Sequence, residues 1–147
     1  MNDSPGAPAA MRWRWLDWPA RARRTVTTGY LALITALLFA PGSTFEDIDR
    51  WLPHQDKVVH VAIFLGLAAL VRWSIAGERG GRRPRLAALA AVMLYAASVE
   101  ALQPQLTTGR LFELSDLASN CLGTLAGWWS FGALPVARPP AREPIPR

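Results

Sequence analysis

The sequence predicts an all-α membrane protein with four transmembrane helices and both termini in the cytoplasm. Hydrophobic residues make up 51% of the 147 residues and charged residues only 18%, against about 25% charged in ordinary soluble domains. Nearly all of the charge lies outside four apolar runs, and prolines and glycines gather between the runs and at the termini, where helices are expected to end. We expect a disordered basic segment at 1–18, one membrane domain at 19–134 and a disordered Pro/Arg-rich tail at 135–147.

The first apolar run covers residues 25–40 and ends at a Pro-Gly pair. A helix of this length rises about 24 Å, slightly less than a hydrocarbon core of about 30 Å. We therefore expect it to begin earlier, with arginine stems reaching the interface. A cleaved signal peptide is the competing interpretation, but Leu38-Phe39-Ala40 is a poor cleavage site, which favours a retained helix.

The other three spans are predicted at residues 56–73, 86–103 and 116–134. Pro104 is expected to end the third span, because proline has no N–H with which to continue a helix. Small residues recur at every fourth position of the last span, and such a ridge lets another helix approach closely. The members of this ridge are Ser115, Ser119, Gly123 and Gly127. The ridge predicts packing inside the chain or association of copies in a homo-oligomer.

Lysine and arginine in the short loops predict the orientation. Five arginines lie in the N-terminal segment up to Arg24, four lie between residues 74 and 85, and three lie in the tail. The opposite side carries only Arg50, Lys57 and Arg110. Both termini are therefore predicted to be cytoplasmic.

The net charge of +5 does not indicate nucleic acid, because the arginines flank apolar segments, where lipid headgroups are the expected anionic partners. Cys121 is the only cysteine, so an intrachain disulfide and a thiolate metal site are excluded. We interpret Cys121 as a small packing residue. No cofactor is predicted.

Three clusters of polar residues lie at the ends of the apolar runs, all on the predicted outer side. Ionisable groups at such a boundary are costly unless they pair or serve a site. The clusters are Asp56-Lys57-x-x-His60, then Glu100-x-x-Gln103, then Arg110 followed by Asp116 and Asn120.

Some of these residues have a simpler explanation. Asp56 and either Ser115 or Asp116 could serve as helix caps, because the first turn of a helix has free N–H groups and favours an acid. His60 could be an amphipathic packing residue in the outer headgroup region.

Glu100 and Asn120 are harder to explain in this way. Glu100 follows fourteen uncharged residues and lies near a helix C-terminus, where the helix dipole disfavours an anion. It should be either neutral or paired with a cation, and Lys57 and Arg110 are the candidates. Asn120 lies one turn inside a span, where an amide needs hydrogen-bond partners. An internal pair of Arg110 with Glu100 or Asp116 would be a sufficient structural explanation.

The order and spacing of these clusters, continued by Gly123 and Gly127, resemble the VanZ-like family of small bacterial membrane proteins. The resemblance covers approximately residues 25–129. It implies a bacterial cytoplasmic (inner) membrane, with the polar cluster facing the cell envelope. The founding member is associated with resistance to the glycopeptide teicoplanin. Because sites rather than folds carry function, this link is not transferred to the chain on fold alone.

We predict a site for an anionic lipid headgroup or a lipid-linked cell-wall precursor. The predicted binding residues are Lys57, His60, Glu100, Gln103, Arg110, Asp116 and Asn120. The two cations would hold a phosphate or carboxylate, and the two amides would orient it by hydrogen bonds. The remaining three residues would tune the site.

The alternative is an enzyme in which Glu100 or His60 acts as general acid or base on a lipid-linked substrate. No serine nucleophile motif accompanies these residues, so an enzyme is not favoured. A zinc site from His60, Glu100 and Asp116 is conceivable, but the sequence lacks a helical His-x-x-x-His, and we predict no metal. A third option is that the cluster only pins the helix ends together.

Overall fold

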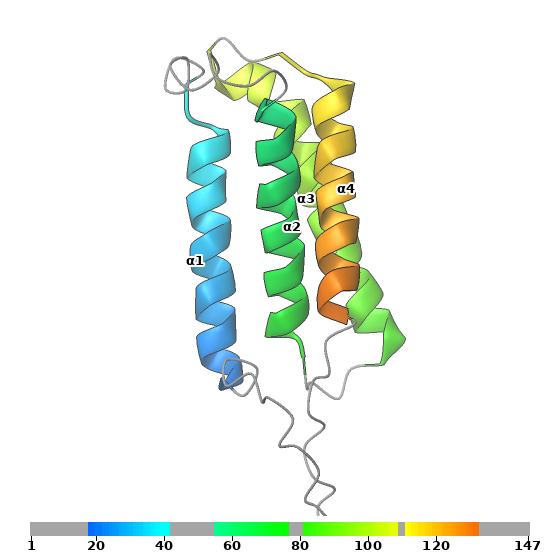
Figure 1. Ribbon diagram of the computed structural model, residues 1–147. Helices are drawn as coiled ribbons and strands as arrows, with labels where there is room; N and C mark the ends of the chain where they lie inside the picture. Colours follow the sequence, from blue (N-terminus) through cyan, green and yellow to red (C-terminus); the bar gives the residue numbers. More distant parts are fainter. Residues whose placement is uncertain (1–17, 42–54, 77–80, 109–110, 133–147) are drawn as a thin grey trace, which may run out of the picture.

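The computed structural model describes residues 18–41, 55–76, 81–108 and 111–132 (Figure 1). The described residues form four α-helices and no strand, which confirms the predicted all-α class. The helices are α1 (Ala20–Leu38), α2 (Gln55–Ser74), α3 (Arg82–Leu106) and α4 (Leu114–Gly132). They form one bundle, in which α2 stands between α1 and α4 and α3 runs behind α2 and α4 (Figure 1).

Each helix begins before its predicted apolar run, and α2 and α3 also end after it. The first helix begins at Ala20, five residues before the apolar run, as its length required. The prediction that Pro104 ends the third helix is wrong, because α3 continues to Leu106. A proline removes the hydrogen bond from its own nitrogen and crowds the carbonyl four residues before it. Later N–H groups are still able to bond, and the Thr107 N–H donates to the Gln103 carbonyl at 2.9 Å.

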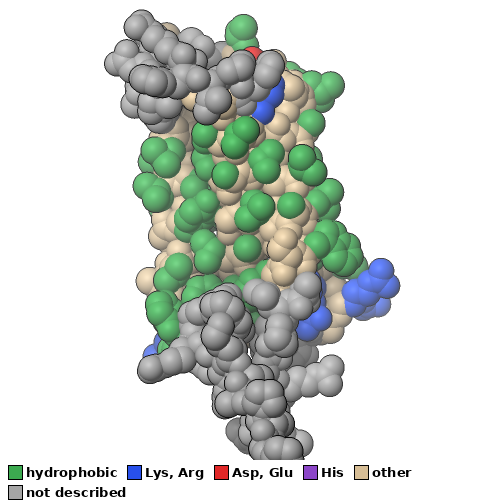
Figure 2. Space-filling model, in the orientation of Figure 1, with side chains coloured by type: hydrophobic (Ala, Val, Ile, Leu, Met, Phe, Trp, Pro, Cys, Tyr) green, Lys and Arg blue, Asp and Glu red, His purple; other side chains and the backbone are tan. Residues whose placement is uncertain are grey.

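By length and composition, α2 and α3 are each able to cross a membrane. Hydrophobic side chains cover the middle of the face seen in Figure 2, and Lys and Arg side chains lie near its two ends. Large exposed apolar residues occur on all four helices, among them Leu33, Leu65, Leu94 and Trp129. Soluble monomers rarely expose so continuous an apolar surface.

All four helices contribute to one apolar core. Phe64 of α2 and Ala96 of α3 are fully buried at its centre, together with Ile34 of α1 and Trp128 of α4. Side chains of α1 also reach the backbone of α2. The Tyr30 hydroxyl, for example, donates to a carbonyl of α2 at 3.0 Å.

The closest backbone approach involves the two glycines of the small-residue ridge. A Cβ atom on Gly123 would overlap the carbonyl oxygen of Val61, and one on Gly127 would overlap that of Leu65. At these glycines the ridge therefore packs against α2 inside the chain, the first of the two predicted alternatives. The hydroxyl of Ser119 only donates to the carbonyl of its own helix at 2.9 Å. Association of copies through the ridge stays a prediction.

Candidate functional site

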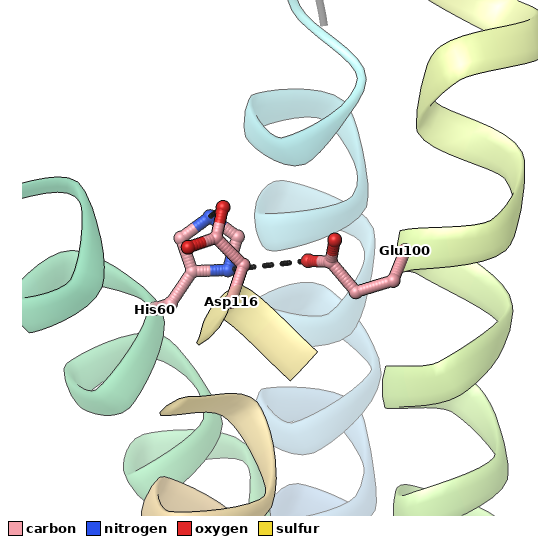
Figure 3. Close-up of side chains that lie close together, drawn as sticks. All are labelled: His60, Glu100 and Asp116. Carbon is pink, nitrogen blue, oxygen red and sulfur yellow. Dashed lines mark ion pairs between the residues drawn. The ribbon is translucent and has the colours of Figure 1, made fainter. Parts of the chain in front are cut away.

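Three buried polar side chains from three helices point toward one another at one end of the bundle (Figure 3). They are His60 of α2, Glu100 of α3 and Asp116 of α4, with 4%, 0% and 8% of their surface exposed. At this end α2 and α4 begin and α3 finishes (Figure 1). His60 is therefore enclosed by the helices, and its depth relative to the headgroup region stays a prediction.

Asn120 links two members of this group. Its Nδ2 donates to Glu100 Oε1 at 3.2 Å, and its Oδ1 lies 2.8 Å from His60 Nδ1. The opposite orientation of the amide would set its oxygen against a carboxylate oxygen. Because an amide oxygen only accepts, the Nδ1 of His60 carries the hydrogen. The prediction that Asn120 needs partners in a dry setting is confirmed, and the amide defines the tautomer of His60.

The two oxygens of the Glu100 carboxylate have different surroundings. Its Oε1 lies 3.7 Å from His60 Nδ1, while its Oε2 is buried with no hydrogen-bond partner within the described part of the chain. The backbone N–H of Glu113 is a further, weaker hydrogen-bond donor to this carboxylate. Of the two candidate cations, Lys57 pairs with other carboxylates instead, and Arg110 lies outside the described residues.

Lys57 is occupied by three other carboxylates. Its Nζ lies 2.8 Å from Asp56 Oδ2, 3.0 Å from Asp116 Oδ1 and 3.1 Å from Glu113 Oε2. The hydrogen bond from Lys57, followed by one from Ser115, lowers the pKa of Glu113. We call Asp56, Lys57, Glu113 and Asp116 the rim cluster.

Asp116 joins the rim cluster to the buried group. Its Oδ1 binds Lys57, while its Oδ2 lies 3.9 Å from His60 Nε2. It is not the N-cap of its helix, because α4 begins at Leu114 and Asp116 lies within the first turn. Asp116 therefore contributes to the side-chain network and, as an acid in the first turn, also interacts favourably with the helix dipole.

Gln103 belongs to a different contact. Its side chain is buried, and its Nε2 donates to the Leu38 carbonyl at the C-terminus of α1, at 2.8 Å. This bond satisfies one of the carbonyls that a helix end leaves free. The structure brings Lys57, His60, Asp116 and the Glu100–Asn120 pair into one network, but it gives Gln103 a structural role.

Sequence reasoning missed Glu113. It precedes α4 by one residue and shares Lys57 with Asp116. The signal was available, because Glu113 and Asp116 are three residues apart at a predicted helix start, where both face one side. An acid in a predicted loop was not counted with the clusters.

Replacing Lys57 with methionine is expected to raise the pKa of Glu113 toward its ordinary value of 4.5, since Lys57 is the main cause of the lowered pKa. A carboxyl whose pKa is lowered by folding contributes stability above its unfolded pKa, and loses it as the pH falls through the folded pKa. The wild type should lose this contribution only below pH 4.5, and the variant should lack it. Carbon NMR titration measures the pKa of Glu113 in the wild type and in the variant. An unchanged pKa would contradict the ion pair, and Arg85→Met at the other end of α3 is the control.

The described network carries more negative than positive groups. Four carboxylates, those of Asp56, Glu100, Glu113 and Asp116, face one lysine and one histidine. Such a set is able to bind a cation or to accept hydrogen bonds from hydroxyl and amino groups. A histidine beside a buried carboxylate is also a common arrangement for proton transfer.

One comparison with known proteins gives a match. The model of the family described as VanZ/LLP1 matches residues 14–135, which is most of the chain. Neither the curated proteins nor the solved structures contain a significant match.

Proposed function

Since the chain belongs to the VanZ/LLP1 family, we propose that it spans the bacterial cytoplasmic membrane four times and presents a polar binding site to the cell envelope. The family and the apolar helices indicate a membrane protein. The four helices have 19 to 25 residues, which corresponds to about 28–38 Å and suits a hydrocarbon core of about 30 Å. On α1 and α4, which fall short of α2 and α3 by composition, large apolar residues such as Leu33, Leu122 and Trp129 also face outward.

The distribution of arginine supports the proposed orientation. Arg21 and Arg24 begin α1, Arg72 ends α2 and Arg82 begins α3, so all four lie at the end of the bundle opposite His60. Positive residues are retained on the cytoplasmic side of a membrane. The rim cluster and the buried group then face the cell envelope.

The proposed ligand is the polar head of a lipid or of a lipid-linked cell-wall precursor. The observation that carries this proposal is a buried polar network that continues into a partly exposed rim, at one end of an otherwise apolar bundle. The side chains of Asp56, Lys57 and Glu113 are 40%, 28% and 52% exposed, so they are available to a headgroup, whereas Glu100 is not. A lipid tail would lie along the apolar surface of the helices.

The roles within the site differ from those expected from sequence. Lys57 already neutralises part of three carboxylates, so it is a weaker anchor for phosphate than a free lysine would be. Arg110 stays the second predicted anion-binding residue. The carboxylates of the rim cluster suit the hydroxyl or amino groups that a precursor headgroup carries. The proposal does not extend to teicoplanin resistance, because family membership by itself does not define a site.

Glu100→Ala, Arg110→Ala and Asn120→Ala are expected to weaken headgroup binding by about tenfold or more. Arg110→Ala would remove a charge-assisted hydrogen bond to the ligand, and the other two would remove the buried network that supports the rim cluster. Native mass spectrometry of the full chain with a polyprenyl phosphate and with phosphatidylglycerol measures the binding and distinguishes the two ligand sources. Leu94→Ala, on the exposed apolar face of α3, is the control. Stably inserted variants that bind like the wild type would refute the proposal.

A second function is favoured by the buried pair itself. Glu100 is completely buried, and Asn120 connects it to His60, an arrangement suited to a general acid or base. Turnover of a lipid-linked phosphate that is lost in a folded Glu100→Gln variant would support an enzyme. Binding without turnover would support the first proposal.

A further inference from the structure

We propose that His60, Glu100 and Asp116 form a binding site for one divalent transition-metal ion of the zinc type. One ligand atom from each residue lies within 4.8 Å of the others. The three residues come from three different helices and are all buried. This inference reverses the prediction from sequence, which found no local metal motif because the ligands are brought together only by the fold.

The distances from His60 to the two carboxylates are too long for direct hydrogen bonds. His60 Nδ1 lies 3.7 Å from Glu100 Oε1, and Nε2 lies 3.9 Å from Asp116 Oδ2. Hydrogen bonds of this kind are usually about 2.7–3.2 Å long. Ligands of a tetrahedral zinc ion, each about 2.0–2.2 Å from the metal, lie roughly 3.3–3.6 Å apart. The distance from Nε2 to Asp116 is close to this spacing. Glu100 approaches the ring on the Nδ1 side, so its carboxylate must turn toward Nε2 to complete a three-ligand site.

The neighbours of the three residues prepare them for this role. Metal-binding histidines commonly donate their second ring N–H to an oxygen, which fixes the tautomer. Asn120 Oδ1 accepts from His60 Nδ1, so Nε2 keeps its lone pair and is the nitrogen that we assign as ligand. Asn120 is a positioning residue, because it orients His60 and Glu100 without binding the ion.

An unpartnered atom and an excess of negative charge point to a cation independently. Glu100 Oε2 is buried without a hydrogen-bond partner in the described ranges, and a buried carboxylate oxygen in this state is costly. Two carboxylates, Glu100 and Asp116, face one histidine. The competing accounts are a protonated His60 between the two carboxylates and a neutral Glu100. Each would leave both gaps open and Glu100 Oε2 without a hydrogen-bond partner.

The site is compatible with zinc by ligand type. Zinc binds imidazole nitrogen and carboxylate oxygen, and sites with three protein ligands keep a fourth position open. The inference does not rest on the proposed headgroup binding. A protein that binds zinc here but no headgroup would retain the metal site and lose the proposed function.

The test uses the full chain purified in detergent, freed of metal by a chelator and then given Zn²⁺ alone. We expect one bound zinc per chain by elemental analysis, and a visible ligand-field spectrum when Co²⁺ replaces it. His60→Gln, Glu100→Gln and Asp116→Asn should each weaken the affinity at least about tenfold, and Asn120→Ala by about 10–100-fold. The controls are Asp56→Asn and Glu113→Gln, which alter the rim cluster but none of the three ligands. They should bind zinc within about twofold of the wild type.

Three results would overturn the metal site. The first is a folded wild type that binds no zinc. The second is unchanged binding in His60→Gln. The third is binding that is lost in Asp56→Asn and Glu113→Gln but kept in Glu100→Gln, which would place the ion on Asp56, Glu113 and Asp116, a second acidic group of similar spacing. If His60→Gln does not fold, Asp116→Asn decides, because Asp116 lies at the edge of the site and its loss is more easily accommodated.

Discussion

Replacing Gly123 and Gly127 together with alanine is expected to lower the free energy of unfolding by about 2–6 kcal/mol, from about 1–3 kcal/mol for each overpacked site. Each new Cβ would overlap a backbone carbonyl oxygen of α2, at Val61 and at Leu65. A side chain is able to rotate away from a clash, but a helix backbone is not. The two helices must therefore separate and lose their packing along the whole contact. Thermal unfolding in detergent, followed by tryptophan fluorescence, measures the loss.

Two other glycines provide matched controls. Nothing lies within 4 Å of a Cβ placed on Gly29 of α1, so Gly29→Ala should be neutral or stabilising by up to about 1 kcal/mol, because alanine favours helix. A Cβ on Gly66 would meet the hydroxyl of Tyr30, the end of a side chain that is able to move. The loss of stability in Gly66→Ala should therefore lie between that of Gly29→Ala and that of the double variant. A double Gly123/Gly127 variant that melts like the wild type would contradict the close approach of α2 and α4.

The same glycines set the geometry of the polar network. His60 directly precedes Val61 on α2, and Asn120 lies three residues before Gly123 on α4. The 2.8 Å contact between His60 and Asn120 therefore depends on the separation of the two helices one turn away. We expect the alanine variants to lose headgroup or zinc binding even if the protein still folds. The positions of the site residues depend on the helices that hold them.

The four helices could be predicted from sequence because apolar runs, and the prolines and glycines between them, indicate local structure. The end of α3 could not, because Pro104 removes one hydrogen bond but does not forbid two more helical residues. The direction of Gln103 could not be predicted either. Gln103 lies about 60° around the helix from Glu100. Because of this angle, Gln103 contacts Leu38 of α1, whereas Glu100 contacts Asn120 of α4.

The candidate site could be predicted in part, as a set of residues at one end of the bundle. Its pairing could not, because partners depend on how each helix is rotated. Lys57 reaches the acids of the rim cluster rather than Glu100, since α4 places Glu113 and Asp116 nearer to it. The burial of His60 could not be predicted either. It depends on the close approach of α4 to α2 that the two glycines permit.

Asn120→Leu is expected to lower the free energy of unfolding by about 2–6 kcal/mol. The volume is nearly kept, but the N–H of His60 and Oε1 of Glu100 both lose their partner in a buried setting, at about 1–3 kcal/mol each. Thermal unfolding of the purified protein measures the change. Ser119→Ala is the control on the same helix, because its hydroxyl serves only its own helix. It should stay within about 0.5 kcal/mol of the wild type.

A double-mutant cycle shows whether Glu100 and Asn120 are coupled or contribute to stability independently. Glu100→Leu alone removes a buried acid but strands the Nδ2 of Asn120, and Asn120→Leu alone strands the carboxylate. When both are replaced, neither group is left unpaired, so the double variant should be more stable than the sum of the single losses by about 0.5–3 kcal/mol. Additive losses would contradict the hydrogen bond between them. If the double variant folds but fails to bind headgroup or zinc, the polar network is retained for its chemistry, because the fold has then been shown to form without it.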